Sequence, residues 1–370
     1  MRMTKVADPQ LSLKPYITAV TLCVGSVWAT SAWAQEDVSP GGDGDGEVVR
    51  EAGPTQSVQN VLREEHALFS DRLTIEPGIS YAYSDRSQLA LSGFLALDAI
   101  FLGEINVDTV SSHITTFDLN FRYGVTERLE FELNFPFLYR SSTYESTGGG
   151  GAAEDDPNVE DSVSEAGLGD ISASLNYRLL NETAQRPDLV WNVGVRAPTG
   201  NDPFGIPTRR VEGSEGNVEI PTELPTGNGV WAVSTGFSVL KTVDPAILFA
   251  NAGYTYNFEE SFGDIDAAEG NQPGDVKLGD SFNLGFGTAF ALNERLSLSM
   301  SYAHQHSFKS ETTQNGVTEE VVGSDANVGT MNFGATYALS DDTSLVTNVA
   351  VGLTDDASDL TVSFRMPFQF

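Results

Sequence analysis

The chain has 370 residues, and its 20 Lys and Arg residues against 52 Asp and Glu residues give a formal net charge of −32. This acidic balance argues against nucleic-acid binding, because such proteins present basic surface to phosphate. After the N-terminal region, no run of about 18 apolar residues offers a second membrane helix. A composition with 40% apolar residues and 36 glycines instead suits a closed β-barrel.

Residues 1–34 have the pattern of an export signal peptide. Basic residues at the start precede an apolar stretch over residues 16–29, and Ala32-Trp33-Ala34 provides a small-x-small cleavage pattern. The chain's only cysteine, Cys23, lies inside this leader, and Leu22 before it is too large for a lipoprotein signal. Removing three basic residues and one acidic residue leaves 17 against 51, so the predicted mature chain has a net charge of −34 and no disulfide.

Two further segments precede the predicted barrel. Residues 35–56 are acidic and rich in Gly and Pro, which predicts a disordered linker. Residues 57–71 instead carry apolar side chains near helical spacing, which predicts a short amphipathic helix. The helix either plugs the barrel lumen, which we favour, or packs on the periplasmic rim. Its apolar residues are Val58, Val61, Leu62, Leu68 and Phe69.

Residues 72–370 predict an all-β fold, a transmembrane antiparallel β-barrel of about twelve strands. Segments near the ~10 residues of a tilted membrane strand alternate between short turns and long polar loops. An even strand number places both termini in the periplasm, where the short turns belong, and the long loops outside. The predicted strands cover residues 73–84, 113–124, 128–140, 169–180, 187–198, 229–240, 245–258, 281–292, 296–308, 326–339, 344–353 and 359–370.

The last strand shows the alternation most clearly. From Leu360 to Phe370, apolar residues occupy every second position and the chain ends on an aromatic. A period of two predicts a strand with one lipid face and one polar face. The final aromatic also resembles the signature by which barrel-insertion machinery recognises its substrates. We assign that signal to Phe364, Met366, Phe368 and Phe370.

The opposite parity of the strands carries charged residues. Because Lys or Arg on the lipid face costs roughly 2–4 kcal/mol at the membrane midplane, these residues are expected to face the lumen. They either act on solutes or pair with each other and hold the barrel rigid. The predicted lumen-lining residues are Glu76, Asp118, Arg122, Glu130, Glu132, Arg178, Arg196 and Arg365.

Residues 88–107 do not fit the strand count, although their apolar content resembles strand material. Counted as a full strand, they would raise the number of strands to thirteen and break the alternation between short turns and long loops. We therefore place them in the first extracellular excursion. Whether they fold into the mouth or meet a neighbouring subunit is left open.

The sequence offers no catalytic or metal centre that we can assign. His304 and His306 share the outward parity of one strand, where rim aromatics are expected, and His66 lies on the predicted helix. A Ser-His-Asp arrangement and a phosphate-binding loop are both missing. We expect no enzyme activity, no cofactor and no metal site.

Four short stretches together resemble a known family. They are Leu73–Tyr83 (LTIEPGISYAY), Tyr123–Leu133 (YGVTERLEFEL), Gly167–Asp170 (GLGD) and Arg196–Gly200 (RAPTG). The set resembles the outer-membrane barrels of the meta-pathway of phenol degradation. The helix followed by LTIEPG also resembles the channels that export functional amyloid in the Fap system, which are trimeric barrels with a helical plug and a coiled coil. Residues 35–55 carry no heptads for such a coiled coil.

The resemblance implies a location in the bacterial outer membrane and passive passage of small solutes, hydrophobic or aromatic in character. The alternative is a secretion-linked barrel that exports an amyloid-like or other protein subunit. Expected partners are outer-membrane lipid, the insertion machinery and a small-molecule solute, without nucleic acid. A homotrimer is implied by the resemblance alone.

Overall fold

The computed structural model describes residues 56, 58, 59, 62, 72–86, 109–146, 159–211, 219–265 and 270–370. The predicted leader, the linker up to residue 55, most of the predicted helix and residues 88–107 lie outside these ranges, so what the sequence predicts for them stays a prediction. Among the described residues, no helix combines the length and apolar character that a bilayer-crossing helix needs.

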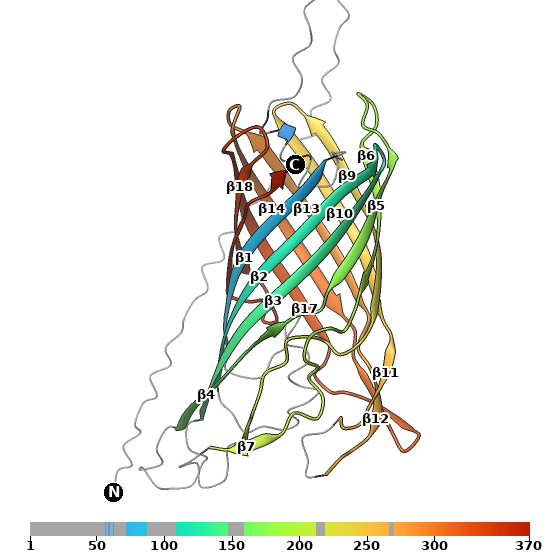
Figure 1. Ribbon diagram of the computed structural model, residues 1–370, viewed down its shortest axis with the longest axis vertical. Helices are drawn as coiled ribbons and strands as arrows, with labels where there is room; N and C mark the ends of the chain where they lie inside the picture. Colours follow the sequence, from blue (N-terminus) through green and yellow to red (C-terminus); the bar gives the residue numbers. More distant parts are fainter. Residues whose placement is uncertain are drawn as a thin grey trace, which may run out of the picture. The chain divides into compact units, whose positions relative to one another are not determined.

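Within the described residues, twelve antiparallel strands close into a barrel, as the sequence predicts (Figure 1). Each strand pairs with its neighbours in the sequence, and the C-terminal strand pairs with the first. The strands are β1 (Leu73–Arg86), β2 (Thr109–Thr126), β3 (Leu129–Ser146), β5 (Ser172–Leu180), β6 (Asp188–Arg196), β9 (Ala232–Val243), β10 (Ala246–Asn257), β13 (Ser281–Ala291), β14 (Leu296–Ser307), β17 (Ala326–Ala338), β18 (Ser344–Gly352) and a last strand in two parts, β19 (Leu360–Arg365) and β20 (Phe368–Gln369).

The last strand is divided by Pro367 but keeps one register. Gly78 opposite Arg365 and Thr74 opposite Gln369 belong to the same alignment with β1. The Met366 amide donates to the Pro77 carbonyl at 3.0 Å, and Pro77 has no N–H with which to return the bond. Pro367 likewise accepts from the Ser344 amide at 3.4 Å and cannot donate back to β18. Two prolines therefore remove donors from the ladders on both sides of this strand.

The outer face of the barrel is a belt of exposed apolar side chains. They follow one parity along each strand, as the alternation predicts. A monomeric soluble protein does not expose so large an apolar surface, whereas a membrane barrel requires it. Members of the belt include Ile79, Tyr81, Phe117, Leu119, Phe131, Phe137, Leu175, Trp191, Phe237, Leu248, Phe282, Phe286, Met300, Phe333, Val351 and Phe364.

The connections at the two ends differ in length. At the end that holds both the first residues of β1 and the last residues of β20, β2 and β3 are separated by residues 127–128, and β9 and β10 by residues 244–245. At the other end, β6 and β9 are separated by residues 197–231. We therefore call the first end periplasmic and the second extracellular.

The extracellular connections, which the sequence predicts as loops, contain strands. Within predicted loop 141–168, β3 continues to Ser146 and β4 (Val159–Leu168) pairs with it. Residues 259–280 and 309–325 form one four-stranded sheet of β11 (Glu259–Phe262), β12 (Gly274–Lys277), β15 (Glu311–Gln314) and β16 (Val317–Glu320). Between β6 and β9, β7 (Thr208–Arg210) pairs with β8 (Glu219–Pro221).

Apart from β4, these strands have only three or four residues, which is too short for a periodic pattern in the sequence. The β15–β16 turn does carry a local signal. Asn315 and Gly316 have φ values of 52° and 78°, which is the backbone of the two-residue hairpin turn that Asn-Gly favours. Small apolar clusters hold this region together, one around Val230 and Val276 and another around Ile220 and Leu224.

Candidate functional site: the inner wall and its two inserted segments

The inner wall of the barrel divides into two contiguous sets of six strands. We call β19, β1, β2, β3, β5 and β6 the charged half, since it holds all eight predicted lumen-lining residues. We call β9, β10, β13, β14, β17 and β18 the neutral half, where Lys241 is the only Lys, Arg, Asp or Glu within these described strands. The two halves differ in what their side chains can do to a solute.

Glu76 is the centre of the charged half. Its side chain accepts a hydrogen bond from Arg122 Nη2 at 2.8 Å and one from Arg365 Nη1 at 2.9 Å. Glu76 is only 3% exposed, and the Arg122 side chain is also largely buried. Buried charges are tolerated only when they are paired in this way. One carboxylate thus joins β1 to both of its neighbours, β2 and β19.

Three other predicted acidic residues accept hydrogen bonds from asparagine amides. Glu132 accepts from Asn120 Nδ2 at 2.6 Å, Asp118 accepts from Asn134 Nδ2 at 3.4 Å, and Glu130 accepts from Asn176 Nδ2 at 3.3 Å. In the described part of the chain, neither Asp118 nor Glu132 forms an ion pair. Their negative charge is therefore not neutralised by direct contact with a cation.

The remaining predicted arginines lie at opposite ends of the barrel. Arg178 Nε lies 3.4 Å from Asp188 Oδ2 at the periplasmic end. Arg196 Nε lies 3.8 Å from Asp170 Oδ2 at the extracellular end, and Arg196 Nη2 donates to Asn257 Oδ1 at 3.1 Å. The eight residues therefore belong to several separate groups along the wall, not to one cluster.

The neutral half is built from Gly, Ser and Asn. The spaces beside its glycines are filled by side chains of neighbouring strands: a Cβ on Gly236 would lie 2.8 Å from Asn192 Oδ1, and one on Gly253 would lie 2.7 Å from Asn283 Oδ1. On Gly285 it would lie 2.9 Å from Asn251 Oδ1. Asparagine amides thus occupy the space beside these glycines, which produces an uncharged polar surface.

One apolar patch interrupts the neutral half near its periplasmic end. It consists of Leu240, Ile247 and Ala289, with Phe249 beside them. Val58 and Leu62 of the N-terminal segment pack against it, and Gln56 Nε2 donates to the Ser340 carbonyl at 2.9 Å in a periplasmic turn. The four described residues of this segment, 56, 58, 59 and 62, are helical. Val61, Leu68 and Phe69 lie outside the described residues.

At the extracellular end, three sequence motifs meet around Asp170, the last residue of GLGD. Asp170 Oδ1 accepts the Gly200 amide at 3.2 Å, and Oδ2 accepts the Asn228 amide at 2.8 Å. Gly200 ends the RAPTG stretch, and Asn228 lies in a later stretch, Pro225–Gly229. We call this arrangement the Asp170 junction.

Two threonines complete the junction. Thr199 Oγ1 donates to the Gly169 carbonyl at 2.7 Å, and Thr226 Oγ1 donates to the Leu168 carbonyl at 2.8 Å. Gly200 and Gly227 pass so close that a Cβ on Gly200 would lie 2.6 Å from Gly227 Cα. The glycines of these motifs are therefore required by the close approach of two chain segments.

Arg140 belongs to the same region and was missed as a functional residue. It is fully buried, and its Nη1 donates to the Pro225 carbonyl at 2.6 Å. The sequence did contain a signal, because Arg140 shares the inward parity of Glu130 and Glu132 on β3. Arg140 is the last residue of the strand predicted over residues 128–140, where the alternation gives the weakest indication of its direction.

The three histidines in the described residues, His113, His304 and His306, lie on the outward parity near the extracellular rim. His113 Nδ1 is 2.7 Å from Tyr81 Oη, and His304 Nδ1 is 3.2 Å from Tyr302 Oη. His306 contacts Asn327 Oδ1 at 2.8 Å. Among the described residues, no three His, Cys, Asp or Glu side chains are grouped so that they could hold a metal ion.

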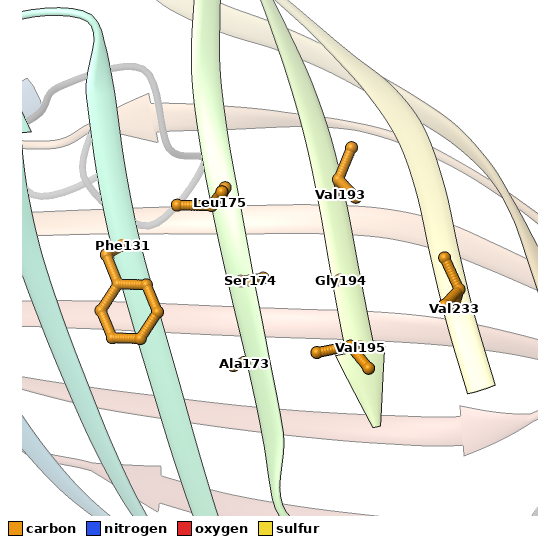
Figure 2. A pocket seen from close by; sticks show the side chains of 8 residues that line it. All are labelled: Phe131, Ala173, Ser174, Leu175, Val193, Gly194, Val195 and Val233. Carbon is orange, nitrogen blue, oxygen red and sulfur yellow. The ribbon is translucent and has the colours of Figure 1, made fainter. Parts of the chain in front are cut away.

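An apolar groove lies on the outside of the barrel and not in the lumen. Figure 2 shows Phe131 at one side and Val233 at the other, with Leu175, Val193 and Val195 between them. These side chains share the outward parity of β3, β5, β6 and β9, and small Ala173 leaves the space that they surround. The groove therefore faces the lipid and is not part of a path across the membrane.

The predicted insertion-signal residues occupy one parity of the last strand. Phe364 and Phe370 are exposed, while Met366 and Phe368 are half-buried. Their placement on one face follows from the continuous register with β1.

Comparisons with known proteins agree with this architecture. The sequence matches the family described as "Putative MetA-pathway of phenol degradation" over residues 103–370. In a crystal structure, an outer membrane channel from Pseudomonas putida F1 has the same fold, with a TM-score of 0.52 and 16% identity, covering 82% of this chain and 97% of that one.

Weaker matches are the translocator domain of autotransporter NalP from Neisseria meningitidis and the Pseudomonas putida toluene transporter TodX. The first has a TM-score of 0.44 and 10% identity over 85% of this chain and 94% of that one. The second has a TM-score of 0.40 and 12% identity over 81% and 89%. Both scores are too low to support an argument. The predicted resemblance to amyloid-export channels has no counterpart among these matches.

Proposed function

The chain belongs to the family described as "Putative MetA-pathway of phenol degradation", and from this premise we propose that it is a passive outer-membrane channel for small solutes. The observation that supports this function best is the inner wall. The neutral half combines glycines with asparagine amides and so leaves a path for a solute beside the charged half. A barrel that served only as a membrane anchor would not need such a path.

The family description points to small aromatic solutes of the phenol type. The wall is consistent with a neutral, polar aromatic, since amides and hydroxyls can bond a phenolic OH without attracting an anion. We expect the purified protein to give ion conductance in planar bilayers, and phenol to reduce that current by occupying the path. Cyclohexanol is the matched non-aromatic control. If no conductance is measured for the full chain or for the variants below, the channel function is wrong.

We further propose that residues 57–69 narrow the periplasmic end as a plug. The support is the apolar patch, because Leu240, Ile247 and Ala289 would otherwise expose apolar surface to a polar lumen. Deleting residues 35–70 should raise single-channel conductance. The double substitution Val58→Asp and Leu62→Asp should do the same, since it places charge against that patch.

A rim-packed helix would behave differently. It would depend on the Gln56 contact with Ser340 and not on Val58 and Leu62. Gln56→Ala is therefore the matched variant. If only Gln56→Ala changes the conductance, or if the deletion leaves it unchanged, the plug is excluded and the rim position is supported.

The C-terminal aromatic face is proposed as the signal for the insertion machinery. Removing Phe370 should lower the amount of folded barrel in the outer membrane and leave refolding in detergent nearly unchanged. Equal loss in both assays would mean that Phe370 only stabilises the fold. The predicted homotrimer is tested by cross-linking in the native membrane.

A further inference from the structure

We propose that Asp170 is a positioning residue that holds two limbs of the β6–β9 connection against the inner wall, and that these limbs set the width of the extracellular mouth. The limbs are residues 197–201 and 224–229. The inference rests on the proposed channel function and adds to it the place where solute size is selected.

Asp170 is suited to this task because one carboxylate bonds both limbs at once. Oδ1 accepts the Gly200 amide from the first limb, and Oδ2 accepts the Asn228 amide from the second. Hydrogen bonds to an ionised acceptor are stronger than those between neutral groups. Asp170 itself is buried, so water competes little for these bonds.

The limbs lie on the inner surface of the wall. Gly167 pairs with Leu138 on the inward parity of β3, and a Cβ on Gly167 would lie 3.2 Å from Thr226. Thr226 is 0% exposed, and Leu224 and Pro225 beside it are also fully buried. Arg140, which shares the inward parity of β3, donates to the Pro225 carbonyl. The second limb therefore takes up part of the cross-section that the barrel would otherwise leave open.

The two limbs pack closely against each other and against Asp170. Gly200 and Gly227 touch backbone to backbone, and a Cβ on Gly227 would lie 2.4 Å from Asp170 Oδ1. Asn201 also accepts the Thr226 and Gly227 amides through its carbonyl, at 3.1 Å and 2.9 Å. The limbs thus form one layer, and the carboxylate of Asp170 joins that layer to the β4–β5 strand.

The first measurement is the accessibility of the second limb in intact cells. Thr226→Cys provides a single buried thiol, since the chain's only cysteine, Cys23, lies in the predicted leader. A membrane-impermeant maleimide should label it slowly. Adding Asp170→Asn should increase the labelling rate at least about tenfold. A tenfold change in the population of the open limb corresponds to about 1.4 kcal/mol, and a hydrogen bond to a charged group contributes more than this.

Two controls accompany this labelling. Val322→Cys, which is 89% exposed, should be labelled equally fast with and without Asp170→Asn. Asp280→Asn removes a carboxylate that anchors a different extracellular segment through Tyr254 and the Asn257 amide. It should leave Thr226→Cys buried.

The second measurement links the limb to the pore. The Cβ of a residue at position 167 would lie 3.7 Å from Thr226 Cβ, which is within the ~3.5–4.5 Å range of disulfides. The Asp170→Asn variant of the full chain should conduct more than wild type. With Gly167→Cys and Thr226→Cys added, oxidation should return its conductance to the wild-type value, and reduction should raise it again.

The outcomes separate this inference from the channel function. If wild type conducts and Asp170→Asn neither exposes Thr226→Cys nor raises the conductance, Asp170 does not hold the limbs. If the thiol becomes exposed but the disulfide has no effect on conductance, the limbs do not set the width. Absence of conductance in every variant, including the one that lacks residues 35–70, would instead overturn the channel function.

Discussion

The charged and neutral halves of the wall are held together by different means. In the charged half, long side chains reach across strands to one another, as Arg122 and Arg365 do to Glu76. In the neutral half, the strands have few long inward side chains, and Asn side chains fill the volume that Gly leaves. The first solution depends on electrostatics and the second on steric fit, so the two halves should respond differently to the same kind of change.

The two inserted segments also divide between the halves. The described part of the N-terminal segment contacts the neutral half near the periplasmic end, where an apolar patch receives it. The limbs of the β6–β9 connection contact the charged half near the extracellular end, where Asp170 and Arg140 receive them. The N-terminal segment therefore contacts the wall through apolar side chains, and the limbs contact it through backbone hydrogen bonds to charged side chains.

The largest effect is expected from Glu76→Gln. This change leaves Arg122 and Arg365 without their shared carboxylate, and removing one partner of a buried ion pair costs about 3–5 kcal/mol. The free energy of unfolding, measured by urea denaturation in detergent with gel mobility as the probe, should fall by about that amount. Glu127→Gln in an exposed turn is the control and should change little. Equal stability of the Glu76 variant would show that the electrostatic description is wrong.

A smaller effect separates the two halves by steric fit. Gly236→Ala on the neutral half places a methyl group 2.8 Å from the Ala252 carbonyl oxygen, which is backbone and cannot move aside. We expect a loss of about 1–3 kcal/mol in unfolding free energy. Gly78→Ala on the charged half meets Arg365 Cγ at 3.2 Å, where a side chain needs to shift by only a few tenths of an ångström, and should lose less. If both variants lose the same unfolding free energy in this denaturation experiment, the neutral half does not depend on steric fit more than the charged half.

Ion selectivity tests the charge of the two halves. Each predicted lumen arginine contacts a carboxylate, while Asp118 and Glu132 are held by amides. Together with the acidic extracellular connections, this arrangement predicts a modest cation preference in the reversal potential under a KCl gradient, which fades as salt rises.

Substitutions on the two halves should shift this preference in opposite directions. Asp118→Asn with Glu132→Gln should weaken it, and Asn251→Asp on the neutral half should strengthen it. An anion preference of the wild-type channel at low salt would mean that the paired arginines still control permeation.

The smallest effect concerns pH outside the membrane. The hydrogen bond from Arg209, at 2.6 Å, lowers the pKa of Asp161 below its usual range and joins β7 to β4. A carboxylate with a lowered folded-state pKa stabilises the fold above its unfolded-state pKa of about 3.9 and loses that contribution as pH falls through the folded-state value.

Because both side chains are partly exposed, we expect less than about 1 kcal/mol from this pair. The opening free energy of the β7 amides, obtained from hydrogen exchange after correction for the intrinsic exchange rate at each pH, should therefore fall more in wild type than in Asp161→Asn between pH 6 and about pH 3. The same pH dependence in both would exclude this pair as the cause.

The sequence predicted the strands well because lipid imposes a local rule. A residue such as Phe131 must face outward and Glu130 inward, whatever the rest of the chain does. Twelve strands could therefore be placed from alternation and loop length alone. The same rule assigned the inward parity of Glu76 and Arg122, though not the bond between them, which depends on strand register.

The Asp170 junction could not be predicted, because its bonds join segments far apart in the chain. Asp170 and Asn228 are separated by 58 positions, and no periodic pattern connects them. The GLGD and RAPTG stretches contribute to the family resemblance, but they do not predict which residues Asp170 contacts. The extracellular sheet could not be predicted for a related reason, since its strands are short and β12 pairs with β15 of a different connection.

The prolines at the junction of the first and last strands have a consequence for how the barrel closes. This seam is the only one in a closed barrel whose two strands lie at opposite ends of the chain, so it is completed after the others. Pro77 removes one donor from it, and Pro367 removes one from the neighbouring ladder. The contact of Arg365 with Glu76 crosses the same seam. We therefore expect this seam to open more easily than a seam with a complete ladder, and the ion pair between Arg365 and Glu76 to hold it closed.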